Sequence, residues 1–174
     1  MQIIYPILFL LIALKWGKWK NFKLYYPTIL FTVIGNLFYS YLFKEYPMWR
    51  FEQTFEEKLL PSTMSITILK SFTSFPILTF LFLSHFPDHR NTTRKLLYIV
   101  FWSILFVLIE IISKWLGMIS YHHGWNMWWS LFFDFVMFSI LAIHYKRPAA
   151  AWILSGLFIL FLWEAFDIHF GILE

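Results

Sequence analysis

LLYIVFWSILFVLIEIISKWL, residues 96–116, runs for 21 residues with charge only at Glu110 and Lys114. About 20 apolar residues in a helix cross the hydrocarbon core of a bilayer, so this run predicts a transmembrane helix. Five other apolar stretches accompany it and predict an all-α membrane protein, a bundle of six transmembrane helices in one integral membrane domain. The spans are expected at about residues 3–19, 25–43, 62–83, 96–116, 125–145 and 149–168 of the domain 1–174.

Two of these spans have irregular features. The apolar part of the first covers only residues 3–14, and it reaches residue 19 if Lys15 and Lys18 extend their side chains toward water. A helix lying in the membrane interface is the alternative for this segment. The third span contains Pro76, which removes a helical hydrogen bond, so we expect an interruption there.

The overall composition excludes a soluble domain. Hydrophobic residues make up 60% of the chain and charged residues only 14%, against about 25% charged in soluble domains. The lipid bilayer is therefore the expected surrounding. The net charge of +4 comes from basic residues in short loops, which favours topology signals over a nucleic-acid partner. The chain has no cysteine, so thiol catalysis and cysteine-held metals are excluded.

Lysine and arginine are unevenly divided between the two predicted sides of the membrane. Nine lie in or beside the loops after spans one, three and five: Lys15, Lys18, Lys20, Lys23, Arg90, Arg94, Lys95, Lys146 and Arg147. Short loops rich in Lys and Arg stay in the cytoplasm, so both termini are expected outside.

On the outer side, Met48, Phe51, Phe55 and Leu59 recur at helical spacing and predict an amphipathic helix within residues 44–60.

Ionisable residues within the spans are the main indication of function, because charge inside a membrane is costly and is seldom kept without a partner or a role. Counted at about 1.5 Å per residue from the outer end of each span, all of them fall in the outer half. The substrate-binding candidates at this level are Lys70, Glu110, Asp134 and Glu164, with the amide of Asn36. They predict a polar cavity that opens outward; separate clamps between helices are the alternative. We also expect Lys70 to pair with one of the carboxylates.

The segment YHHGWNMWW at residues 121–129 is expected to form the outer turn between spans four and five. His122, His123 and Asn126 are therefore further substrate-binding candidates, at the mouth of the cavity. Adjacent histidines on a helix point in different directions, so a hydrogen-bonding or proton-sensing role is favoured over a metal site. Glu110 and Lys114, four residues apart, predict an ion pair within one helix.

The sequence contains none of the phosphate-loop, dinucleotide-binding, nucleophile-elbow or zincin motifs. It identifies no catalytic residue and no cofactor. Several strings do resemble an uncharacterised family of small membrane proteins from bacilli and clostridia. They are Tyr26-Pro27-Thr28-Ile29, Tyr46-Pro47-Met48-Trp49, Leu83-Ser84-His85-Phe86-Pro87, Tyr121-His122-His123-Gly124-Trp125-Asn126 and His144-Tyr145-Lys146-Arg147-Pro148. The resemblance implies a bacterial cell membrane and implies no activity.

Three classes of function fit these observations. The first is a protein that binds or transports a small molecule or ion through the outward polar cavity. The second is an accessory or sensor subunit, in which the charges join helices and the outer surface meets a membrane protein partner or a second copy of the chain. The third is an intramembrane enzyme that uses Glu110, Asp134 and one of the two histidines as acid and base.

Overall fold

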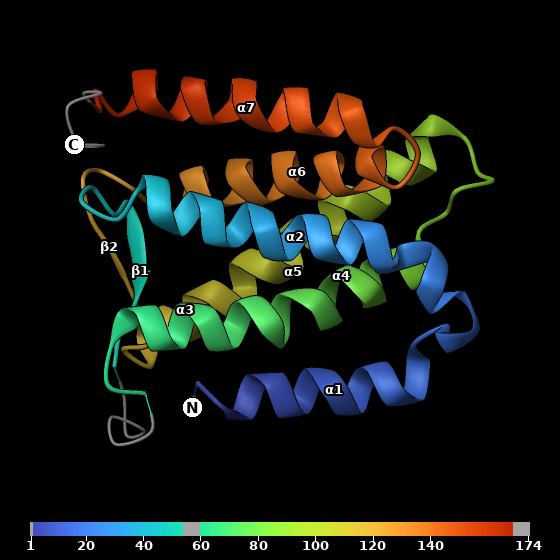
Figure 1. The fold of residues 1–174 in the computed structure, drawn as a ribbon, viewed down its shortest axis with the longest axis horizontal. Helices are drawn as coiled ribbons and strands as arrows, with labels where there is room; N and C mark the ends of the chain where they lie inside the picture. The colour runs from blue at the N-terminus through green and yellow to red at the C-terminus, as the bar shows by residue number, and fades with distance from the viewer. Residues whose placement is uncertain (1, 54–59, 169–174) are drawn as a thin grey trace.

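Helices that run back and forth along one axis make up most of the molecule, and the two ends of the described chain lie at the same end of the bundle (Figure 1). The computed structural model describes residues 2–53 and 60–168. Its elements are α1 (Ile4–Trp16), the short 3-10 helix η1 (Trp19–Asn21), α2 (Phe22–Leu42), β1 (Trp49–Phe51), α3 (Thr63–Phe72), α4 (Ser74–His85), α5 (Thr92–Trp115), β2 (Ile119–Tyr121), α6 (Met127–His144) and α7 (Pro148–Ala165).

Four helical stretches are long and apolar enough to cross a membrane: Thr63–His85, Thr92–Trp115, Met127–His144 and Pro148–Ala165. These match the third to sixth predicted spans. The first prediction is too long, because α1 ends at Trp16 and its 13 residues measure about 20 Å, against about 30 Å for a hydrocarbon core. α2 has 21 residues and would be long enough, but Lys23 and Asn36 make it less apolar.

The interruption expected at Pro76 is confirmed. α3 ends at Phe72 and α4 begins at Ser74, with Thr73 between them at φ −124° and ψ −76°. Pro76 cannot donate a hydrogen bond to the carbonyl of Phe72, and its ring crowds that turn. The break places Lys70 in the last turn of α3, just before the direction of the helix changes.

The connections expected on the outer side fold differently from the prediction. The described part of residues 44–60 holds no helix; instead β1 pairs with β2 in an antiparallel sheet, with Trp49 opposite Tyr121 and Phe51 opposite Ile119. Phe51 in β1 and the preceding Met48 are buried. The rest of the expected helix, residues 54–59, lies outside the described residues. We call residues 46–53 and 118–125 the cap.

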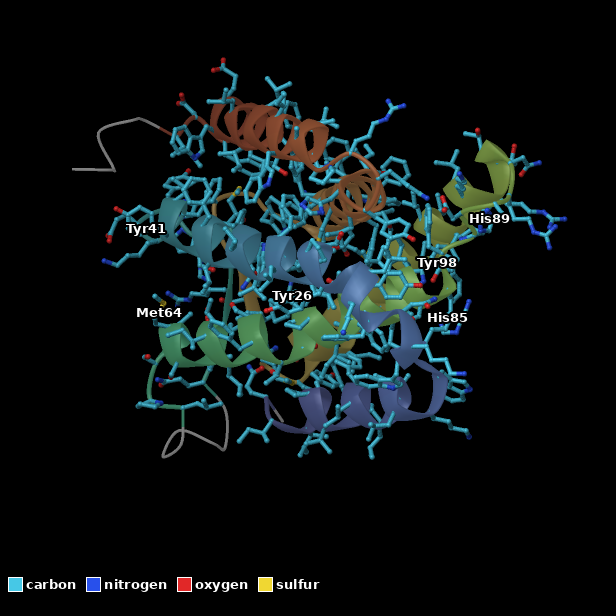
Figure 2. The ribbon with its side chains drawn as sticks, turned by 45° about the vertical axis from the view of Figure 1, so that its right-hand side comes forward. Tyr26, Tyr41, Met64, His85, His89 and Tyr98 are labelled. Atoms are coloured by element: carbon cyan, nitrogen blue, oxygen red, sulfur yellow. The ribbon has the colours of Figure 1, made fainter. Side chains whose placement is uncertain are left out.

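The opposite end of the bundle carries the basic loops. Asp88, between α4 and α5, accepts a hydrogen bond from Lys146 after α6, and Lys95 lies 3.8 Å from the same carboxylate. Figure 2 shows the contrast between the ends, with Tyr41 and Met64 at the cap end and His85, His89 and Tyr98 at the basic end. The loops that the charge count assigns to one side are therefore at one end of the bundle.

Candidate functional site

A cavity of about 330 Å³ lies at the centre of the bundle, with lining residues from every helix α1 to α7 and from both strands. Most of its wall is aromatic or aliphatic, and includes Phe31, Tyr39, Phe106, Phe133 and Trp152. Four of the predicted site residues also line it: Asn36, Lys70, Glu110 and Asp134. An apolar cavity with a few convergent polar groups is the usual form of a small-molecule site.

Lys70 has a partner that the sequence did not suggest. Its side chain is buried at 6% exposure, and its ammonium nitrogen lies 3.9 Å from the centre of the Phe51 ring. No carboxylate of the described residues lies within 4.0 Å of this nitrogen, so the predicted ion pair is wrong. A cation over an aromatic face is attracted by the negative centre of the ring, and β1 positions Phe51 for that contact.

Glu110 is held by a relay of hydrogen bonds. The indole Nε1 of Trp125 donates to the Ser130 hydroxyl at 2.8 Å, and that hydroxyl donates to Oε1 of Glu110 at 2.6 Å. The predicted pair with Lys114 is not formed, because the Lys114 ammonium lies over the Tyr121 ring, 3.9 Å from its centre. Burial raises the pKa of the Tyr121 phenol, and the neighbouring Glu110 carboxylate raises it further.

Asp134 has a buried carboxylate oxygen that the described residues leave without a hydrogen bond. The residue is 7% exposed, and its Oδ2 has no hydrogen-bond partner among the described residues. The hydroxyl oxygen of Ser74, which also lines the cavity, is in the same condition. Buried polar atoms are nearly always bonded, so the two unbonded oxygens set this part of the cavity wall apart.

Asn36 joins two helices beside the cavity. Its amide Nδ2 donates to the Ser71 hydroxyl at 2.7 Å, and that hydroxyl donates to the Thr67 carbonyl within α3 at 2.7 Å. Asn36 is therefore both a clamp between α2 and α3 and part of the cavity wall. The alternative of clamps between helices applies at this position and at Glu110.

Glu164 is not among the residues that line the cavity. It lies in the last turn of α7 and is exposed, whereas α7 residues of the cavity wall such as Ser155 and Ile159 lie on the opposite face of the helix. A depth count places a residue along a helix axis but not around it, which is why Glu164 was grouped with the others.

The two histidines and Asn126 lie in or beside the cap, and the lining of the cavity described above includes none of them. His122 Nε2 is 2.7 Å from the Ser120 hydroxyl, and the exposed His123 stacks on Tyr46 with ring centres 3.7 Å apart. Asn126 caps α6, accepting hydrogen bonds from the backbone N–H groups of residues 128 and 129. The contacts described for the three positions are within or beside the cap, and their role as substrate-binding residues at the mouth of the cavity stays a prediction.

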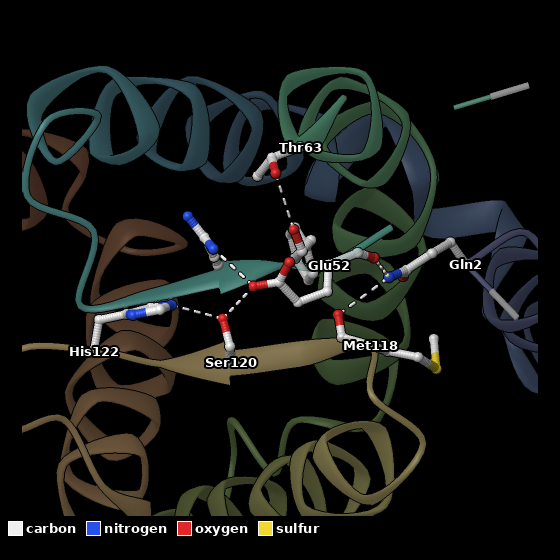
Figure 3. Close-up of polar contacts among 8 residues, drawn as sticks. Gln2, Glu52, Thr63, Met118, Ser120 and His122 are labelled. Atoms are coloured by element: carbon white, nitrogen blue, oxygen red, sulfur yellow. Dashed lines mark hydrogen bonds and ion pairs between the residues drawn. The ribbon is translucent and has the colours of Figure 1, made fainter. Parts of the chain in front are cut away.

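Figure 3 shows the polar network that holds the cap together. The carboxylate of Glu52 accepts hydrogen bonds from Ser120 and, at 2.8 Å, from Arg50. Gln2 donates to the backbone carbonyls of Glu52 at 3.0 Å and Met118 at 3.2 Å. The network therefore joins β1, β2 and the start of the chain.

The cap network does not have the arrangement of a nucleophilic triad. In a triad the histidine accepts the serine proton and the carboxylate holds the other ring nitrogen. Here the Ser120 proton goes to Glu52, so His122 donates to Ser120. Partial burial by itself raises the pKa of Glu52, but the hydrogen bonds from Ser120 and Arg50 and the charges of Arg50 and His122 outweigh it and hold that pKa below its usual value.

Several of these residues gave a weak signal in the sequence. Trp49-Arg50-Phe51 alternates apolar and polar as a strand does, but three residues are too few to separate from a helical pattern. Ser130, Ser71 and Gln2 are ordinary polar residues until their partners, between 20 and 116 positions away, are known. Among the described residues, no three histidine or acidic side chains come together as a metal-holding group.

Comparisons with protein-family models, with curated proteins and with solved structures find no match to this chain.

Proposed function

We propose that this protein binds a small amphiphilic molecule in the central cavity, as a membrane-embedded binding or transport protein. The observation that carries the proposal is the buried Asp134 carboxylate, which lines the cavity with an unbonded Oδ2. A structural clamp would use that oxygen, as the Glu110 carboxylate uses its Oε1. A binding site keeps it available for the ligand.

The chemistry of the wall indicates the kind of ligand. The ammonium group of Lys70 offers N–H donors, and the one contact described for it is with the Phe51 ring. Asp134 and Ser74 offer unbonded oxygens. A molecule that fits these groups has one polar end, which carries a hydrogen-bond acceptor for Lys70 and a hydrogen-bond donor for Asp134. The aromatic wall favours an apolar body for the rest.

The proposal includes six spans and an outward cap. It is supported by the alternating helices of Figure 1 and by the basic residues around Asp88 at the other end. The family resemblance adds the bacterial cell membrane. A membrane-impermeant thiol reagent applied to intact cells is expected to leave cysteines at Lys20 and Arg94 unlabelled and to label one at Lys44. Labelling at positions 20 and 94 but not at position 44 would show that the protein has the opposite orientation in the membrane.

An accessory or sensor subunit is the second candidate, favoured by the two clamps at Asn36–Ser71 and Ser130–Glu110. In that case the partner would be another membrane protein or a second copy of the chain. An intramembrane enzyme has less support, because His122 and His123 lie in the cap and the cavity lining contributed by the described residues has no imidazole base.

Native mass spectrometry of the purified protein, released from lipid nanodiscs, tests the binding proposal. We expect wild-type protein to retain a small molecule that Lys70→Met and Asp134→Asn lose. Lys44→Met is the matched control, since Lys44 is an exposed lysine paired only with Glu45 among the described residues. Equal retention by all four proteins, or none by the wild type, would contradict the proposal and favour the accessory subunit.

A further inference from the structure

The helices α2 and α7 run in the same direction (Figure 1), and their aromatic contacts fix which residues face each other. The rings of Phe31 and Trp152 meet edge to face with centres 4.7 Å apart. Near the cap, the Phe43 and Trp163 rings lie 6.5 Å apart. Residues that differ in number by about 121 are therefore at the same level on these two helices.

One helical turn beyond the Phe31–Trp152 contact, both helices have a glycine, Gly35 on α2 and Gly156 on α7. Both line the cavity, and a Cβ added to either would meet no heavy atom within 4 Å. The two aromatic contacts are 12 residues apart along α2, which is about 18 Å of helix. Between them, the space beside the glycines is open.

The residues around this space are accessible from outside the bundle as well as from the cavity. Phe38 and Trp152 line the cavity, yet their exposures are 49% and 44%. We call the opening bounded by Gly35, Phe38, Trp152 and Gly156 the portal. It lies on the side of the bundle, where a membrane protein meets the acyl chains of the bilayer.

The portal is at the same level as the polar end of the cavity. Asn36 follows Gly35 and hydrogen-bonds to Ser71, which follows Lys70. A molecule passing between the glycines would therefore reach Lys70 without moving along the bundle axis. The route through the cap is covered instead, because Trp49, Phe51, Ile119 and Trp125 form the outer wall of the cavity.

We propose that the ligand is a zwitterionic lipid amphiphile that enters from the bilayer through the portal, with its acyl chain lying between α2 and α7. This inference rests on the proposed function and specifies the ligand class and the route. The apolar sides of the portal suit an acyl chain, which loses no hydration on moving from lipid to cavity. A phosphate on the head would accept hydrogen bonds from Lys70, and an ammonium group would donate to the free oxygen of Asp134.

A lysophosphatidylethanolamine that carries a photoactivatable diazirine at the start of its acyl chain, beside the head group, is the probe for this route. In nanodiscs, we expect it to crosslink to cavity-facing residues of α3 and α6 as well as to the lipid-facing surface. Gly156→Trp would fill the portal and should lower the crosslinking of α3 and α6 about tenfold relative to the surface. Leu157→Trp is the matched control, because Leu157 is the next residue and is 58% exposed.

Gly35→Leu closes the portal from its other side and keeps the test decisive if the tryptophan variant fails to fold. Unchanged crosslinking of α3 and α6 in the folded portal variants would overturn the lateral route. If Lys70→Met still reduced that crosslinking, the proposed function would stand without the portal. Surface crosslinking alone in the wild type would overturn the lipid ligand, and native mass spectrometry would then decide the binding proposal separately.

Discussion

The ammonium nitrogen of Lys70 lies 3.9 Å from the centre of the Phe51 ring, so a cation on a membrane helix is held by an aromatic residue of the cap. The same strand is fixed to the start of α3 by a hydrogen bond from the Thr63 hydroxyl to the Phe51 carbonyl at 3.1 Å. The cap therefore closes one end of the cavity and also positions Lys70 in its wall. Movement of β1 would change the closure of the cavity and the position of Lys70 together.

The Lys70–Phe51 contact predicts a measurable coupling. In a double-mutant cycle of Phe51→Leu and Lys70→Met, we expect an interaction energy of about 0.5 to 2 kcal/mol in the free energy of unfolding. Unfolding in mixed micelles measures it. The cycle of Phe51→Leu with Lys44→Met should be additive, since Lys44 contacts Glu45 instead. Additivity in the first cycle would mean that the cation gains nothing from the ring.

The hydrogen-bond relay to Glu110 predicts that Ser130 stabilises the fold. Ser130→Ala would remove the acceptor of the buried Trp125 indole and the donor to Glu110, at a cost of about 0.6 to 1.7 kcal/mol. Ser139→Ala on the same helix removes only a bond to the Phe135 carbonyl within α6. It should cost less, and equal losses in the two variants would argue against the relay.

The lowered pKa of Glu52 predicts how the cap depends on pH. A carboxyl with a lower pKa when folded stabilises the protein above its unfolded pKa of about 4.3, and the contribution is lost as the pH falls toward the folded pKa. The difference in stability between wild type and Glu52→Gln should therefore be constant near pH 7 and shrink below about pH 4. A difference that grows on acidification would have the wrong sign.

The stability of an Asp134 variant distinguishes a ligand-binding carboxylate from one that clamps two helices together. Because its Oδ2 has no partner among the described residues, Asp134→Leu should leave the stability unchanged or raise it by about 1 kcal/mol. The same variant should lose the retained small molecule. A loss of about 3 kcal/mol, as expected on breaking a buried charged pair, would show that the carboxylate holds helices together.

Apolar runs and prolines were sufficient to predict much of the fold. Four spans and the break near Pro76 follow from local rules, because length and hydropathy act within one segment. The pairing of β1 with β2 does not follow from them, because Trp49 and Tyr121 are 72 positions apart and each strand has only three residues. A strand of that length is stabilised by the burial of Phe51 within it and of the neighbouring Met48 rather than by its own propensity.

The depth count along the predicted spans grouped residues that do line one cavity. Asn36, Lys70, Glu110 and Asp134, which it placed at one level, are all in the cavity wall. Glu164 has a similar depth but faces outward, since rotation about a helix axis depends on how the neighbouring helices pack. The partner of Lys70 was missed for a different reason: a carboxylate is the expected partner of an ammonium group, and only the fold of the cap brings Phe51 closer.

Chemical access to the charged residues tests the cavity itself. The chain has no cysteine, so single cysteines at Lys70, Glu110 and Asp134 can be compared with one at Phe138, which is buried in the core at 1% exposure. N-ethylmaleimide, which is small and uncharged, is the reagent, applied to protein shown to be folded. We predict that the three cavity positions react and that position 138 does not. Three cavity cysteines as unreactive as the one at position 138 would contradict the account.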